Sequence, residues 1–138
     1  MGGTGPEVRV LIAEDEPIFQ ELYKGTMSKW GLPLRIEVVD NGFDGLVAVG
    51  RHVPDVLIVD LLMPGMDGFE MVRSLRANSA LGGMDIIVVS ALENAEIEAR
   101  GGLPADVVRY VKPIPFPELR GFFQAKVATK LKAQHFRA

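Results

Sequence analysis

The sequence predicts an α/β fold, a doubly wound five-stranded parallel sheet with helices on both faces. Two observations lead to this prediction. Short aliphatic runs alternate with longer amphipathic segments five times along the chain, and this alternation is typical of a parallel sheet. The short runs are also almost continuously apolar, as expected for strands that are covered on both faces.

The five predicted strands are short and rich in β-branched residues. Only the second, L-R-I-E-V-V, alternates clearly with polar residues, so we place it at an edge of the sheet. The predicted strands are Val8 to Ala13, Leu34 to Val39, Val56 to Val59, Ile86 to Val89 and Val107 to Val111.

A helical pattern follows each strand. The first helix begins at Pro17, which suits a first turn, and ends at Gly31. The second ends before Pro54, because proline cannot continue a helix. The predicted helices are Pro17 to Gly31, Phe43 to His52, Phe69 to Asn78, Asn94 to Arg100, and Pro117 towards the C-terminus.

Composition narrows the class of protein. The 138 residues suit one domain, and the absence of cysteine excludes a disulfide framework and a thiolate metal site. A net charge of −3 does not provide the excess of positive charge that is typical of nucleic-acid-binding proteins. There is neither a signal peptide nor an apolar run near the ~20 residues of a membrane span. We therefore expect a cytoplasmic protein with a disordered start at residues 1–7 and a single domain at residues 8–138.

Polar residues follow all five predicted strands, and Asp40 follows the second, the presumed edge strand. Since ligands of such sheets bind at the carboxyl ends of the strands, the side chains after the other four strands are the candidate site. Glu14 and Asp15 follow the first strand, Asp60 the third, Ser90 the fourth and Lys112 the fifth.

These residue types suit phosphoryl chemistry. Carboxylates that converge repel one another unless a cation joins them, and Mg²⁺ prefers such oxygen ligands together with a phosphate. Asp60 is a candidate nucleophile, because carboxylates form aspartyl phosphates. Lys112 and Ser90 suit phosphoryl oxygens, so the sequence predicts that Asp60 is presented to a phosphoryl donor beside a metal.

Taken together, these motifs resemble the response-regulator receiver domain of bacterial two-component systems. The resemblance covers about Val8 to Leu131, with the elements in the order and near the spacings of that family. The motifs are Glu14-Asp15, Asp60 followed by Leu-Leu-Met-Pro-Gly-Met-Asp-Gly, Ser90-Ala91 and Lys112-Pro113.

The resemblance implies a flavodoxin-like sheet of order 2-1-3-4-5 and phosphorylation of Asp60 by a sensor histidine kinase or a histidine phosphotransfer protein. It implies Mg²⁺, or Mn²⁺, held by Asp15, Asp60 and the Leu62 carbonyl, with Glu14 assisting. Ser90 and Lys112 would then grip the phosphoryl group. The surface of the fourth helix, fifth strand and fifth helix would report the change to an output domain or protein; a homodimer is left open.

The resemblance also implies a cis peptide between Lys112 and Pro113. One residue departs from the family pattern, since Arg109 stands where receivers commonly have Tyr or Phe. An unpaired guanidinium is expensive to bury. We therefore expect Arg109 to stay at the surface, packed along its stem or paired with Glu96 or Glu98.

Three other functions are possible for a sheet of this kind. A haloacid dehalogenase-type phosphatase would carry a second Asp two residues after the nucleophile, where this chain has Leu62, so turnover of an external substrate is not expected. A flavin-binding module would need a Ser/Thr-rich loop where this chain has Glu14 and Asp15. A receiver-like module that signals without phosphorylation is the remaining alternative.

The last predicted helix is longer than the sheet requires. It has room for about six turns, and Phe136 keeps the apolar spacing of Phe122 and Leu131. Either the chain is a stand-alone regulator with a frayed tail, or its last helix continues into a linker and an output domain. We favour the second explanation.

Overall fold

Five parallel strands form one sheet of order β2-β1-β3-β4-β5. The computed structural model describes the backbone of residues 6–137 and the side chains of residues 6–133. The strands are β1 (Val8–Ala13), β2 (Leu34–Val39), β3 (Val56–Val59), β4 (Asp85–Ser90) and β5 (Val108–Val111). The predicted strand positions, the parallel sheet and the edge position of β2 are confirmed.

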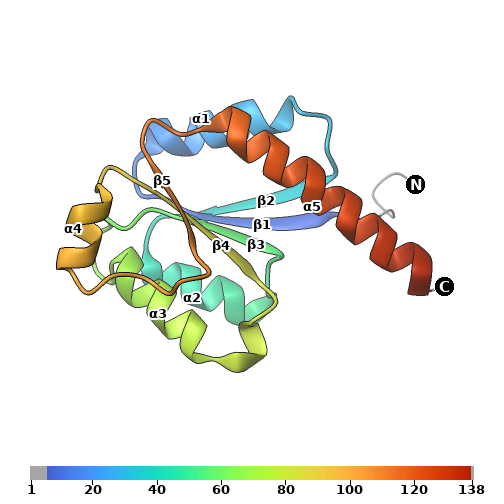
Figure 1. The fold of residues 1–138 in the computed structure, drawn as a ribbon. Helices are drawn as coiled ribbons and strands as arrows, with labels where there is room; N and C mark the ends of the chain where they lie inside the picture. Colours follow the sequence, from blue (N-terminus) through green and yellow to red (C-terminus); the bar gives the residue numbers. More distant parts are fainter. Residues whose placement is uncertain (1–5, 138) are drawn as a thin grey trace.

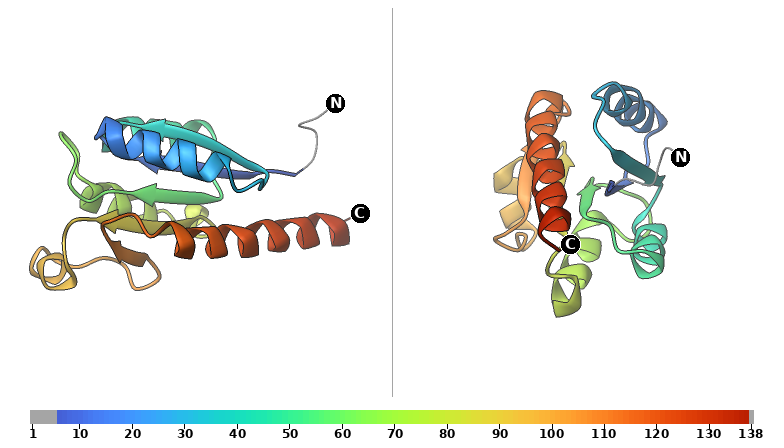
Figure 2. Two further views of the ribbon diagram at one scale, coloured as in Figure 1. Left: turned by 90° about the horizontal axis from the view of Figure 1, so that it is seen from above. Right: turned by 90° about the vertical axis from the view of Figure 1, so that its right-hand side faces the viewer.

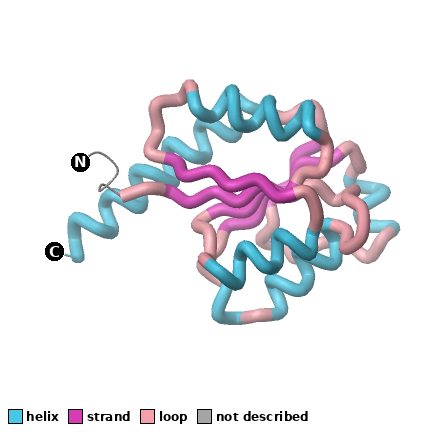
Figure 3. The backbone as a smooth tube through the Cα atoms, turned by 180° about the vertical axis from the view of Figure 1, so that it is seen from behind, coloured by secondary structure: helices cyan, strands magenta, loops and turns pink. Residues whose placement is uncertain are grey.

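Helices cover both faces of this sheet (Figures 1 and 3). One face carries α1 and α5, and the other carries α2 and α3, while α4 lies at the end of the sheet. The helices are α1 (Pro17–Ser28), α2 (Gly42–Arg51), α3 (Gly68–Ala77), α4 (Asn94–Ala99) and α5 (Phe116–Arg137), with a 3₁₀ turn at Ser79–Leu81.

Each face of the sheet has its own apolar core. Tyr23 of α1 and Phe123 of α5 pack with Val10 and the other even-numbered residues of β1. Leu11 of β1 packs instead with Met71 of α3 and the rest of the opposite core. This division follows from the alternation of side chains along a strand, and it fixes the strands that carry the site.

The first helix ends earlier than the sequence predicts. The amides of Lys29 and Trp30 bond to the carbonyls of Thr26 and Met27, three residues back, so the last turn tightens after Ser28. Gly31, the predicted end, has φ of 69° and lies beyond this turn. The 3₁₀ turn at Ser79–Leu81 was not predicted; Asn78 Oδ1 accepts a hydrogen bond from Ala80 N there.

The last helix continues past the end of the sheet, as Figure 2 shows. Its 22 residues run from Phe116 to Arg137. Lys126 and Lys130 pair with Asp85 and Asp55 at 2.7 and 2.8 Å. The expectations for residues 1–5 and for the side chain of Phe136 lie outside the described residues, so the disordered start stays a prediction.

Candidate phosphoryl site

The residues after β1 and β3 lie side by side at the carboxyl end of the sheet. Ala13 and Val59, the last residues of the two strands, are register partners. Asp60 N donates a hydrogen bond to the Ala13 carbonyl at 3.0 Å. The next side chains are those of Glu14 and Asp60, which are 1% and 5% exposed. Two carboxylates are thus brought together in a largely buried place.

Lys112, which follows β5, joins these two carboxylates. Its Nζ lies 3.0 Å from Glu14 Oε1 and 2.9 Å from Asp60 Oδ2. The Lys112 side chain is 11% exposed. Buried carboxylates must be paired, and this lysine supplies the pairing. The predicted cis peptide between Lys112 and Pro113 is confirmed.

Burial and hydrogen bonding together set the pKa values of Glu14 and Lys112. Desolvation raises the pKa of Glu14, although the Glu16 amide and Lys112 both stabilise its charged form. For Lys112, burial acts to lower the pKa, but the hydrogen bonds to Asp60 and Glu14 outweigh it and raise the pKa. The lysine therefore stays charged at neutral pH.

Asp15 completes a group of three acidic residues. Carboxylate oxygens of Glu14, Asp15 and Asp60 all lie within 4.8 Å of one another. One Mg²⁺ ion spans oxygens up to roughly 4 Å apart, so small side-chain adjustments bring these ligands into reach of one ion. Asp15 does not cap α1, since the N-cap position is Glu16 and no side chain bonds there. The donor set fits a hard divalent cation.

The loop between β3 and α3 is built closely around Asp60. Leu62 N donates to Asp60 Oδ1 at 3.1 Å, and the Leu62 side chain is 42% exposed. Gly65 has φ of 73°, a conformation that favours glycine. A Cβ at Gly68 would lie 2.7 Å from Leu61 Cα and even closer to the Asp60 carbonyl oxygen. The Pro-Gly-Met-Asp-Gly stretch therefore lets α3 start directly against the Asp60 backbone.

Ser90 lies next to this cluster without bonding to its carboxylates. The residue is fully buried, and in the described part of the chain its Oγ accepts one hydrogen bond, from Leu92 N at 3.3 Å. The Ser90 carbonyl accepts a hydrogen bond from Lys112 N at 2.8 Å. The backbone of Ser90 thus holds Lys112 in place, while the hydroxyl stays near the β4–α4 loop.

Two residues of α1 contribute to the site and were not predicted. The Phe19 ring lies 3.8 Å from Lys112 Nζ, at cation–π distance. Gln20 Nε2 donates to the Glu14 carbonyl at 2.6 Å and to Asp40 Oδ1 at 2.7 Å. The sequence carries one signal for them: the first helix starts at Pro17, three residues after Glu14, so its first turns must lie close to the strand ends.

Arg109 occupies the expected surface position. Its Nη1 lies 2.8 Å from Glu98 Oε2, with side chains 26% and 62% exposed. The predicted pairing with the fourth helix is confirmed for this structure. The guanidinium therefore reaches outward from β5 to α4, and it is not inserted beneath the helix.

Comparison with known proteins decides the family. The model of the response regulator receiver domain matches residues 10–123. The chain belongs to the receiver domain family. As a receiver domain it is a module of two-component signalling, and the haloacid dehalogenase and flavin-binding alternatives have no support.

Curated relatives are similar to this receiver domain over most of its length. The probable C4-dicarboxylate response regulator DctR of Priestia megaterium is 30% identical over 128 residues, 88% of this chain and 55% of that protein. Protein PilG of Pseudomonas aeruginosa is 26% identical and covered to 87% in both chains. The chain spans about half or less of the length of several relatives it matches.

A solved structure supports the fold. The receiver domain of a signal transduction histidine kinase from Syntrophus aciditrophicus superimposes with a TM-score of 0.76. That domain is 27% identical, and the match covers 88% of this chain and 91% of the other. No helix among residues 6–137 of this receiver domain is long and apolar enough to cross a membrane.

Proposed function

We propose that Asp60 accepts a phosphoryl group from the phosphohistidine of a sensor histidine kinase or of a histidine phosphotransfer protein. A carboxylate oxygen of Asp60 attacks phosphorus, an oxygen–phosphorus bond forms, and the phosphorus–nitrogen bond breaks with its electron pair returning to the histidine ring. The observation that supports this proposal is a buried aspartate at a strand end, held beside a charged lysine and two further carboxylates.

Each neighbouring residue has a role in this proposal. Lys112 donates one hydrogen bond to Glu14 and one to Asp60. It would move onto the phosphoryl oxygens, since its charge is needed where negative charge develops. Ser90 would turn its hydroxyl from Leu92 N towards the same oxygens. These movements carry the change from the site into the β4–α4 loop.

A divalent cation fits the acidic group. Asp15, Asp60 and the Leu62 carbonyl would hold Mg²⁺ or Mn²⁺, with Glu14 assisting, and hard oxygen ligands are the ones these ions prefer. When bound, the ion supplies positive charge that offsets the repulsion between carboxylates and the charge of the transferred group.

The chemistry is confined to the domain's own phosphorylation and a slow self-dephosphorylation. Leu62 and Leu92, two residues after Asp60 and Ser90, are apolar and unable to position a hydrolytic water. We expect a long-lived phosphoryl group in the cytoplasm, where the kinase acts. A half-life of seconds for the wild type would contradict slow self-dephosphorylation.

The surface formed by α4, β5 and α5 would pass the signal to an output domain or protein. Since Arg109 is paired with Glu98 at this surface, we expect it to contact the partner rather than to swing inward. Structures with and without beryllofluoride test this point. An inward Arg109 in the activated form would show that the usual aromatic movement survives the substitution.

The central experiment compares Asp60→Asn with wild type. Acetyl phosphate and Mg²⁺ should phosphorylate the wild type and leave Asp60→Asn unlabelled, because the amide keeps the shape but is no nucleophile. Asp44→Asn, which removes an exposed carboxylate from α2, is the matched control and should be labelled like wild type. Full labelling of Asp60→Asn would refute the proposal.

A further inference from the structure

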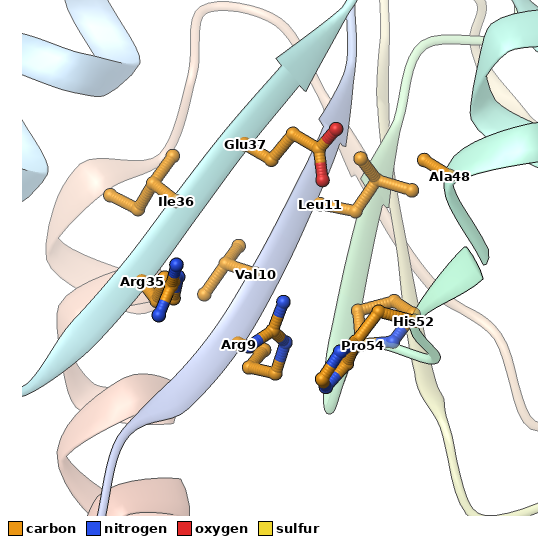
Figure 4. Close-up of a pocket in the computed structure, with 9 residues that line it drawn as sticks. All are labelled: Arg9, Val10, Leu11, Arg35, Ile36, Glu37, Ala48, His52 and Pro54. Atoms are coloured by element: carbon orange, nitrogen blue, oxygen red, sulfur yellow. The ribbon is translucent and has the colours of Figure 1, made fainter. Parts of the chain in front are cut away.

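A cavity of about 270 Å³ lies on the α2 face of the sheet, away from the phosphoryl site. Arg9 precedes Glu14 by five residues of β1, or about 16 Å along an extended strand. Figure 4 shows the cavity with side chains from β1, β2 and the end of α2 around it. The lining residues are Arg9, Val10, Leu11, Arg35, Ile36, Glu37, Ala48, His52 and Pro54.

Two arginines stand side by side in this cavity. Arg9 of β1 and Arg35 of β2 are register partners in adjacent strands, and neighbouring strands lie only about 4.8 Å apart. Both point to the face that carries Leu11, because residues two apart share a face. Like charges placed directly opposite each other destabilise a sheet. Something must therefore offset the charge of this arginine pair.

The described residues offset it only in part. Arg35 Nη1 lies 3.8 Å from Glu7 Oε1, and both side chains are well exposed. Within residues 6–133, the guanidinium of Arg9 has neither an ion pair nor a hydrogen bond. Only the backbone of Arg9 is bonded to Asp55: its amide donates to Asp55 Oδ2 at 2.8 Å, and its carbonyl accepts from Asp55 N at 2.9 Å. Arg9 is nonetheless partly buried. A free guanidinium fork directed into a cavity is suited to an oxyanion.

The cavity has opposite polarity at its two ends. In Figure 4 the side chains of Arg9, Arg35 and His52 gather at the lower end, and the Glu37 carboxylate lies at the upper end. An oxyanion fits the first group, while the carboxylate accepts hydrogen bonds from a hydroxyl or an amine. Leu11 and Ala48 add apolar wall between them. The volume exceeds that of a single water by several fold.

We propose that this cavity binds a small organic acid, with its acidic oxygens between Arg9, Arg35 and His52 and a hydroxyl or amino group near Glu37. The acidic group is a phosphate ester or a carboxylate, since the arginine fork matches both. The ligand neutralises the cross-strand arginine pair. It binds independently of Asp60, because its contacts lie at the other end of β1.

The test uses the whole chain without divalent cations and two probes, glycerol 3-phosphate and citrate. Both carry hydroxyl groups, so they differ mainly in the acidic group. Amide chemical shifts are followed at constant ionic strength. We expect saturable shifts at millimolar probe, at residues 9–11, 35–37 and 48–52, and none centred on residues 14, 15 and 60.

Three variants complete the experiment. Arg9→Gln and the exposed Arg35→Gln should each weaken binding about tenfold or more, because a charge-assisted bond is lost. Arg51→Gln, on the last turn of α2 and outside the cavity lining, should leave affinity unchanged. If only one probe binds, the cavity selects its acidic group, a phosphate ester or a carboxylate. If both bind, the cavity recognises the oxyanion that the two probes have in common. No saturable shift with either probe, or equal binding by Arg9→Gln, overturns the proposal.

Discussion

At each end of the sheet, one lysine contacts an aspartate next to a central strand. Lys112 lies 2.9 Å from Asp60, after β3, and also contacts Glu14. Lys130 lies 2.8 Å from Asp55, before β3, and donates to the Glu7 carbonyl at 2.5 Å. Both clusters pair a lysine with an aspartate, but the second acceptor is a carboxylate at Lys112 and a backbone carbonyl at Lys130. They differ in burial, because Glu14 and Asp60 are almost inaccessible whereas the Asp55 side chain is 27% exposed.

The pKa shifts of Glu14 and Asp55 have opposite signs. Desolvation is the largest influence on both Glu14 and Asp55 and acts to raise each pKa. At Glu14 it prevails and the pKa is raised. At Asp55 the hydrogen bonds from Lys130 and from Arg9 N outweigh it, and the pKa is lowered.

This difference separates the cluster at Asp60, which we propose to be the functional one, from the structural cluster at Asp55. A carboxylate with a lowered pKa stabilises the fold at neutral pH, and one with a raised pKa opposes it. The cluster at Asp55 therefore fastens α5 to the sheet. The carboxylates of the cluster at Asp60 repel one another, and a bound cation would relieve this repulsion, as expected for a site shaped by chemistry.

The largest expected effect is a loss of phosphorylation rate when Lys112 is replaced, compared with the replacement of Lys130. Lys112→Gln should slow phosphorylation by acetyl phosphate by about 10²-fold or more, because charge at the phosphoryl oxygens is lost. Lys130→Gln is the matched variant at the other end and should react at the wild-type rate. Radiolabel incorporation over time measures both. Similar losses in the two variants would remove the distinction between the clusters.

The second prediction concerns the structural cluster. Asp55→Asn should lower the free energy of unfolding by about 2 kcal/mol at neutral pH, since Lys130 and Arg9 N lose a charged acceptor. The Asp55 pKa is lowered from 3.8. Its contribution is therefore complete above pH 3.8 and is lost as the pH falls through the folded-state pKa. Urea unfolding at several pH values measures this, and an unchanged difference at low pH would contradict it.

The opposite sign is expected at the functional cluster. Without divalent cations, Glu14→Gln should raise the free energy of unfolding at neutral pH by about 1 kcal/mol. The folded-state pKa of Glu14 is raised above 4.5, so its ionised form opposes folding as the pH rises above that value. The gain should vanish as the pH falls below 4.5. A loss of stability at neutral pH would show that Lys112 more than offsets the burial.

The smallest effect is expected at a more exposed pair. Arg109 and Glu98 are 26% and 62% exposed, and solvent screens such pairs. Glu98→Gln should change the free energy of unfolding by less than about 0.5 kcal/mol. Thermal unfolding beside Asp55→Asn measures the contrast. If Glu98→Gln lowered the free energy of unfolding as much as Asp55→Asn does, the size of the effect would not follow the burial of the charged groups.

Sequence patterns predicted the strands well because burial on both faces leaves a strong apolar signal. All five runs, from Val8 to Val111, became strands of one sheet. The rule that ligands bind at the carboxyl ends of the strands also predicts that Glu14, Asp60 and Lys112 lie together, and Lys112 does contact both carboxylates. Helix ends were less predictable: α1 ends at Ser28 and not at Gly31, because local backbone bonding decides the last turn.

Other contacts between distant elements could not be predicted from the sequence. Nothing in the residues around Phe19 indicates that its ring lies on the Lys112 ammonium, because that contact depends on how α1 packs against the β5–α5 loop. The pairing of Arg9 with Arg35 likewise depends on the register of β1 and β2. The polar alternation of the second strand placed it at an edge, but it gave no register.

Helix α5 has the dimensions of a lever that joins the phosphoryl site to the far end of the sheet. It is a rod of 22 residues, about 33 Å long. It starts four residues after Lys112, and its ion pairs at Lys126 and Lys130 form the fulcrum. A tilt of roughly 5° about these ion pairs would displace the Arg137 end by roughly 1 Å. A tilt of the helix near the phosphoryl site would therefore reappear, in the opposite direction, where the rod projects beyond the sheet.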